Sequence, residues 1–185
     1  IRRQRQMCIR DSVCIVATEP SSFLDDYSAK NTWKKCDTLY YIVPRIHPKE
    51  PIIHLSAHSE SLINNVFFPT SVQDSPDPDY DLVSVTVIKH HMYSSEELAI
   101  QVKLELEKHF FLKQARFIKH YKLPMALPDL SSVSYNPKPR IMNFDDKILL
   151  CGDHTVNGSL NAAMLSGELA SKQVLNHLKH GNQMN

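Results

Sequence analysis

The residues best suited to chemistry lie near the C-terminal end of the chain, in the segment from Ile148 to Gly167. An apolar run reaches Cys151, Gly152-Asp153 interrupts it, and a short polar loop leads into a stretch of small residues. This order predicts a strand, a turn and a helix that runs from Ser159 to about Leu178. The turn would stand at the carboxyl end of the strand, where α/β sheets bind their ligands.

The predicted turn offers a ligand both a negatively charged hydrogen-bond acceptor and the positive end of a helix. Asp153 could accept hydrogen bonds from the hydroxyls of a ribityl or ribose chain, and the positive end of the helix dipole suits a carbonyl or phosphate oxygen. Three of the four glycines of the chain fall here, namely Gly152, Gly158 and Gly167. Because glycine serves where backbone must approach something closely, we favour a ligand over the alternative, a tightly packed strand–helix junction.

Two stretches of this segment resemble a known family. Residues 151–154 (Cys-Gly-Asp-His) and 158–167 are similar to the C-terminal flavin motif of FAD-dependent amine oxidases, in particular the phytoene desaturase-like oxidoreductases. The resemblance implies FAD as cofactor, with the Asp on the ribityl–pyrophosphate region and the helix start facing the flavin. The implied cofactor-binding residues are Gly152, Asp153, His154, Gly158, Ser159, Leu160, Asn161, Ala162 and Ala163. The chain departs from the family at Ala162, where glycine is usual.

The resemblance also implies an α/β fold, in which an α+β substrate domain is inserted into a Rossmann-like FAD-binding domain. The expected parts are a non-native or disordered leader (1–12), a flavin-domain strand and connection (13–35), the substrate domain (36–144) and the closing strand–turn–helix (145–185). The arginine-rich leader has an alternative interpretation as a basic targeting or nucleic-acid arm. The sequence contains no G-x-G-x-x-G fingerprint. In the family this fingerprint lies near the N-terminus, so we expect a C-terminal fragment.

Local patterns predict the intervening elements. Apolar, β-branched and aromatic runs predict strands at 13–18, 38–43, 52–56, 62–68, 82–88 and 115–121, and those between residues 36 and 90 are expected to form an antiparallel meander. Ser94 and Glu97 form a capping box for a helix whose apolar face is Leu98, Val102, Leu106 and Phe110. Residues 33–35 and 129–144 are expected as connections, and 179–185 as a frayed end.

The segment from Tyr121 to Pro128 is apolar and stiffened by proline. In the resembled family a similar element lies at the substrate cavity, which makes Tyr121, Leu123, Pro124 and Leu127 the candidate cavity residues. The alternative is a plain loop packed under the sheet. The resemblance further implies a small-molecule substrate of hydrophobic character.

The composition excludes some classes of partner. A net charge of +1 gives no basis for nucleic-acid binding, and no run of eighteen apolar residues predicts a membrane span. The four cysteines lack metal-ligand spacing, which favours a reduced, intracellular and cytoplasmic protein. A plastid location and peripheral membrane contact stay open, and the oligomeric state is not specified.

Ten histidines raise the question of a metal. A spacing of four in a strand separates His54 from His58 by about 13 Å, too far to share an ion, so no metal is expected. His90 and His91 are interpreted as solvated. His154 is expected to orient a neighbour or to face solvent rather than to act in catalysis.

These observations lead to one hypothesis with two alternatives. The chain is expected to be the C-terminal part of an FAD-dependent oxidoreductase, inactive alone, in which hydride passes from an apolar or amine substrate to the flavin. No residue is identified as an acid or base. The alternatives are a flavin-dependent polyene isomerase of the same family and a non-catalytic binding domain, the latter favoured by the alanine at position 162.

Overall fold

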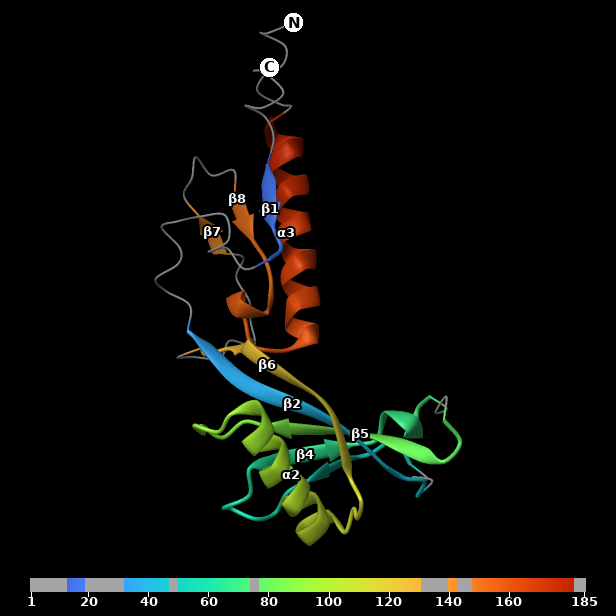
Figure 1. Ribbon diagram of the computed structural model, residues 1–185. Coiled ribbons are helices and arrows are strands. Elements are labelled where there is room, and N and C mark those ends of the chain that lie inside the picture. Colours follow the sequence, from blue (N-terminus) through green and yellow to red (C-terminus); the bar gives the residue numbers. More distant parts are fainter. Residues whose placement is uncertain are drawn as a thin grey trace, which may run out of the picture. The chain divides into compact units, whose positions relative to one another are not determined.

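The computed structural model describes residues 13–18, 32–46, 50–73, 77–130, 140–142 and 148–181. The chain forms two compact units. The first consists of Ile1–Lys34 together with Leu127–Asn185, and the second of Lys35–Ala126. Strands β2 and β6 carry the chain from one unit to the other (Figure 1). Among the described residues, no helix is long and apolar enough to cross a membrane.

The first unit contains a small sheet and a long helix. Its strands lie in the order β1-β8-β7, with β1 parallel to β8 and β7 antiparallel to it. Their bounds are Cys14–Val16, Ile148–Leu150 and Arg140–Met142, and they are followed by the 3-10 turn η4 (Asp153–Thr155) and helix α3 (Leu160–Gly181). The predicted strand, turn and helix are confirmed.

Two features of the first unit differ from the prediction. Residues 129–144, expected as a connection, contain β7, whose register with β8 pairs Ile141 with Leu149. Helix α3 continues to Gly181, past the expected end at Leu178. Of the segment expected to fray, residues 182–185 lie outside the described residues.

The second unit is built on a five-stranded sheet with the order β3-β4-β5-β2-β6. The pairs β3–β4, β4–β5 and β5–β2 are antiparallel. Strands β3, β4 and β5 form the predicted meander, whereas β2 pairs with β5 and not with β3. The strand bounds are Trp33–Pro44 (β2), Ile53–Leu55 (β3), Ile63–Phe67 (β4), Tyr80–Val87 (β5) and Arg116–Pro128 (β6).

Helix α2 (Ser95–Phe110) lies along one face of this sheet (Figure 1). The predicted capping box is confirmed, because the Ser94 side chain accepts from the Glu97 N–H and the Glu97 carboxylate accepts from the Ser94 N–H. Leu98, Val102 and Leu106 are fully buried against the sheet. From the sheet side, alternating residues complete this core, namely Leu39, Tyr41, Val43, Val83, Val85 and Val87.

Two segments expected outside regular structure belong to strands. Residues 33–35 form the start of β2, and the segment from Tyr121 to Pro128 forms the second half of β6 rather than a loop. The prolines at 124 and 128 are compatible with a strand there because β6 is the last strand of the sheet. An edge strand tolerates residues that cannot donate to a ladder.

Candidate functional site

Gly152 sets the direction of the turn between β8 and α3. Its backbone has φ of 145° and ψ of 171°, a region that essentially only glycine occupies. A Cβ atom at this position would stand 2.7 Å from two ring atoms of His154. Glycine at this turn therefore has two separate causes, one in the backbone and one in the packing against His154, and neither is the close approach of a ligand that the sequence analysis favoured.

Three groups close a ring of hydrogen bonds behind the turn. The Gly152 N–H donates to the Ser166 Oγ (3.1 Å), and the Thr155 hydroxyl donates to the Gly152 carbonyl (2.7 Å). The two hydroxyl oxygens lie 2.8 Å apart. Because the Thr155 proton is already directed at Gly152, Ser166 must be the donor between them. The ring attaches the turn to the second turn of α3.

The start of α3 keeps two donors available. Ser159 acts as the cap, since its Oγ accepts from the Ala162 N–H (3.2 Å) and its carbonyl accepts from the Ala163 N–H (3.0 Å). Within the described part of the chain, the N–H groups of Leu160 and Asn161 have no acceptor, and both residues are exposed. An oxygen bearing negative charge would find two N–H groups and the positive helix end there.

Gly158 joins the two groups of residues that the sequence singled out. A Cβ on Gly158 would lie 3.3 Å from a ring carbon of Pro128 and 3.4 Å from a methyl of Leu127. The loop before α3 therefore packs against the end of β6 within the first unit. Leu127, a candidate for the substrate cavity, is in this way placed beside a candidate for the cofactor.

The other candidates of the turn differ in exposure. The Asp153 side chain is one-third exposed, and its Oδ1 lies 4.0 Å from the Nδ1 of His154. His154 is buried, with 6% of its surface exposed, so the interpretation that it faces solvent is wrong. Ala162 is buried as well, at 4%, and its methyl group lies among protein atoms.

The candidate cavity residues lie along β6 with much apolar surface exposed. Tyr121, Leu123 and Leu127 are separated by even numbers of residues, so strand alternation places them on one face of β6 and Pro124 on the opposite face. Tyr121 packs edge-on against Tyr40, with ring centroids 5.9 Å apart. The exposed fractions of Tyr121, Leu123 and Leu127 are 43–49%, so the described residues leave nearly half of each side chain accessible.

The second unit contains a polar cluster that the sequence analysis missed. Asp37 of β2 binds two imidazoles, the Nε2 of His120 through Oδ1 (2.6 Å) and the Nε2 of His91 through Oδ2 (3.2 Å). His120 on β6 is also 2.7 Å, through its Nδ1, from the hydroxyl of Ser95 at the start of α2. The side chains of both histidines are at most one-tenth exposed.

The hydrogen bonds of this cluster follow from the carboxylate. An ionised Asp37 can only accept, so both Nε2 atoms must carry protons. In the neutral form of His120, Nδ1 is then an acceptor, and the Ser95 hydroxyl donates to it. The Asp37 cluster, which we define as Asp37, His91, His120 and Ser95, ties β2, β6 and the start of α2 together.

No local pattern could have identified the Asp37 cluster. Asp37 is separated by 54 residues from His91 and by 83 from His120, and each partner comes from a different element. The interpretation of His91 as solvated is wrong, because its side chain is only one-tenth exposed and contacts Asp37. The pairing of β2 with β6 brings His120 to Asp37, and the pairing of β2 with β5 brings the connection after Val87, which contains His91.

We expect Asp37→Asn to destabilise the second unit by about 1–3 kcal/mol, because hydrogen bonds to a charged group are lost. The NH2 group of the new side-chain amide would also face one of the two imidazole N–H groups, so that two donors would meet without an acceptor. Urea unfolding followed by circular dichroism measures the loss. Asp79→Asn, an exposed change in a turn, is the matched control. Equal stability of the two variants would show that the Asp37 cluster is not a structural tie.

Comparisons with known proteins support the fold and no closer relationship. No family model and no curated protein matches the sequence. A structure of the PF1083 protein from Pyrococcus furiosus matches with a TM-score of 0.55 and 11% identity, over 83% of this chain and 34% of that one.

A second match is a protein from Exiguobacterium sp. 255-15 whose assignment as a protoporphyrinogen oxidase is provisional. Its TM-score is 0.53 and its identity 17%, over 87% of this chain and 38% of that one. The chain thus spans little more than a third of the length of the structures it matches. At these identities the matches establish a shared mixed α/β fold.

Proposed function

We propose that this chain is the C-terminal part of an FAD-dependent oxidoreductase that takes hydride from an apolar or amine substrate. The observation that carries the proposal is the start of α3, where two exposed N–H groups without acceptors adjoin Gly158 and the end of β6. The fold shared with a protein provisionally assigned as a protoporphyrinogen oxidase supports the same class of chemistry.

The residues of the turn fit a flavin in their donor chemistry. The N–H groups of Leu160 and Asn161 would hold an oxygen on which negative charge develops, a form of stabilisation that needs no side-chain acid. The carboxylate of Asp153, one-third exposed, would accept hydrogen bonds from ribityl hydroxyls. When bound, the flavin supplies the redox chemistry, and the protein supplies binding and orientation.

The alanine at position 162 does not argue for a damaged site. Its methyl group is buried among protein atoms, so it occupies no space that a ligand at the exposed helix start would need. The burial of Ala162 therefore favours the flavoprotein proposal over the non-catalytic alternative. Leu127, a half-exposed apolar residue of the same unit, would contact a hydrophobic substrate.

We expect Asp153→Ala to reduce the flavin affinity of the complete gene product about five- to 100-fold, because a charged acceptor of hydroxyl bonds is lost. Flavin absorbance after dialysis against known FAD concentrations measures the affinity. Asp129→Ala removes an exposed carboxylate from the same unit and serves as the control. Unchanged affinity would remove Asp153 from the site. A gene product that neither contains nor takes up FAD would overturn the proposed function.

A further inference from the structure

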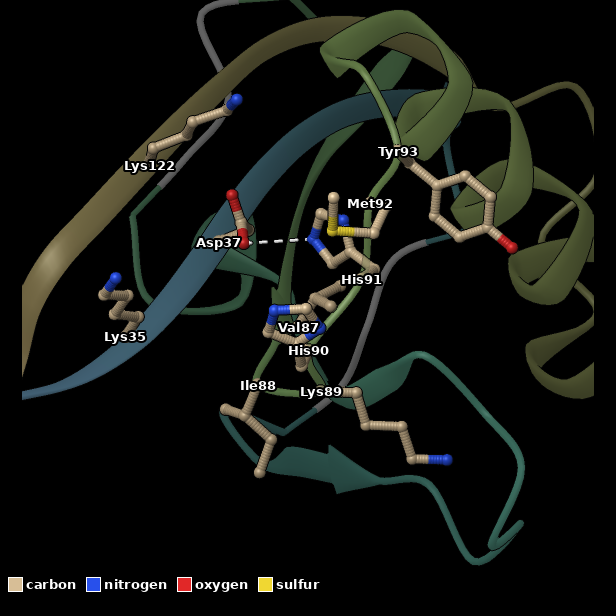
Figure 2. Close-up of a pocket in the computed structure, with 10 residues that line it drawn as sticks. All are labelled: Lys35, Asp37, Val87, Ile88, Lys89, His90, His91, Met92, Tyr93 and Lys122. Atoms are coloured by element: carbon tan, nitrogen blue, oxygen red, sulfur yellow. Dashed lines mark hydrogen bonds and ion pairs between the residues drawn. The ribbon is translucent and has the colours of Figure 1, made fainter.

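A cleft of about 480 Å³ opens in the second unit, beside the Asp37 cluster and apart from every residue proposed to hold flavin. Its walls come from three elements (Figure 2). Lys35 and Asp37 belong to β2, Lys122 to the neighbouring strand β6, and residues 88–93 form the connection from β5 to α2. All of these residues lie within Lys35–Ala126, so the cleft is a property of one compact unit.

The charges around this cleft are unbalanced. Of the residues that the structure describes, three lysines line it, and Asp37 is its single carboxylate. Both oxygens of Asp37 are already engaged by imidazole N–H groups, as Figure 2 shows for His91. Among the described residues, neither Lys35 nor Lys122 forms an ion pair with a carboxylate. Lys89 donates to a backbone carbonyl, that of Ser59.

The imbalance favours a negatively charged ligand. Positive groups that line a cleft raise the local concentration of anions, because the low-dielectric walls focus the field. Lysine ammonium groups bind phosphate and carboxylate as point charges. A cation would find lysines in the walls and a single carboxylate that is already bonded to His91 and His120.

The same cleft also exposes apolar surface. Met92 is 90% exposed, Ile88 58% and Tyr93 42%, and all three line it together with the lysines. A simple inorganic ion would leave this surface in contact with water. A ligand with an apolar body would cover it and gain about 25 cal/mol for each Å² of apolar area removed from water.

We propose that this cleft binds an organic anion, a phosphate or carboxylate group joined to an apolar body. Lys35 and Lys122 hold the charged group from two adjacent strands, and Ile88, Met92 and Tyr93 contact the body. The Asp37 cluster fixes the connection that carries the apolar residues, because His91 belongs to it. The chemistry is shared by a free organic phosphate and by the head of an anionic lipid.

The first experiment titrates the 185-residue chain with phenyl phosphate while backbone amide shifts are followed by NMR. We expect shifts concentrated at residues 35–37, 88–93 and 122, and weakening at raised salt. Inorganic phosphate should bind more weakly because it lacks the apolar body. Phenyltrimethylammonium, of similar size and opposite charge, should leave the same amides unchanged.

Charge-removing variants test the assignment of the lysines. The double variant K35Q/K122Q should bind phenyl phosphate about tenfold more weakly. The control K113Q/K119Q removes the same charge from exposed positions outside the cleft and should stay within about twofold of the unaltered chain. Equal affinities of the two double variants would overturn the proposal, as would equal binding of phenyltrimethylammonium at the cleft.

Sedimentation with vesicles distinguishes the two sources of the ligand. Binding to phosphatidylglycerol vesicles but not to phosphatidylcholine vesicles, lost in K35Q/K122Q, would identify a lipid head. Binding of phenyl phosphate without vesicle binding would identify a free organic anion. Failure of both probes would overturn the proposal, whatever the flavin content of the gene product proves to be.

Discussion

Gly152→Ala should destabilise the first unit by about 1–3 kcal/mol through the backbone alone, because φ of 145° with ψ of 171° is strained for any residue with a Cβ. The contact with His154 adds to this cost. The new methyl would lie 2.7 Å from ring atoms of a buried side chain that has little room to move. Displacing the ring would also disturb the neighbouring Asp153, so flavin affinity should fall together with stability.

Hydrogen exchange of the backbone amides of β8 and α3 measures the effect of Gly152→Ala on the stability of the first unit. Gly167→Ala is the matched control, because its Cβ would meet nothing within 4 Å and it lies in the interior of α3. There alanine should stabilise the helix by about 0.5–1 kcal/mol. Two variants with the same chemical change should therefore shift protection in opposite directions. Equal protection in both would contradict the role assigned to the Gly152 backbone.

Leu106→Ala should cost the second unit about 2–5 kcal/mol. The side chain is fully buried between α2 and the sheet, and the neighbours Leu98 and Val102 are held by the same core. Truncation would remove apolar contacts and leave a cavity that a close-packed sheet fills only in part.

Leu104→Ala, one half-turn away on the exposed side of α2, isolates the effect of Leu106 burial. Leu104 is 55% exposed, so its truncation should change stability by no more than about 0.5 kcal/mol. Urea unfolding of both variants, monitored by circular dichroism, gives the comparison. If the two losses were equal, α2 would not pack on the sheet through the face that its sequence pattern indicates.

Local chemistry explains which elements could be predicted. The capping box at Ser94 and Glu97, the apolar face of α2 and the alternation of β5 each lie within a few consecutive residues, so the sequence alone predicts them. The same holds for the turn at Gly152, where glycine precedes a polar loop. In these segments the structure-determining contacts are local.

Features that depend on tertiary pairing could not be predicted. Whether Tyr121 to Pro128 is loop or strand depends on β2 offering an edge to pair with. Burial of His154 depends on the backbone direction of Gly152. The Asp37 cluster combines residues from distant segments, each of which, taken alone, resembles a solvated polar side chain. Distance along the chain, rather than residue type, limited the sequence analysis.

The hydrogen-bond ring of Gly152, Thr155 and Ser166 determines how the turn can receive a ligand. Both hydroxyl protons are used within the ring, so neither hydroxyl can donate to a ligand, and the donors of the proposed site are the N–H groups of α3. The turn is therefore ordered during folding and not at the moment of binding. A ligand of the proposed site would therefore lose less affinity to the entropy of arranging this turn.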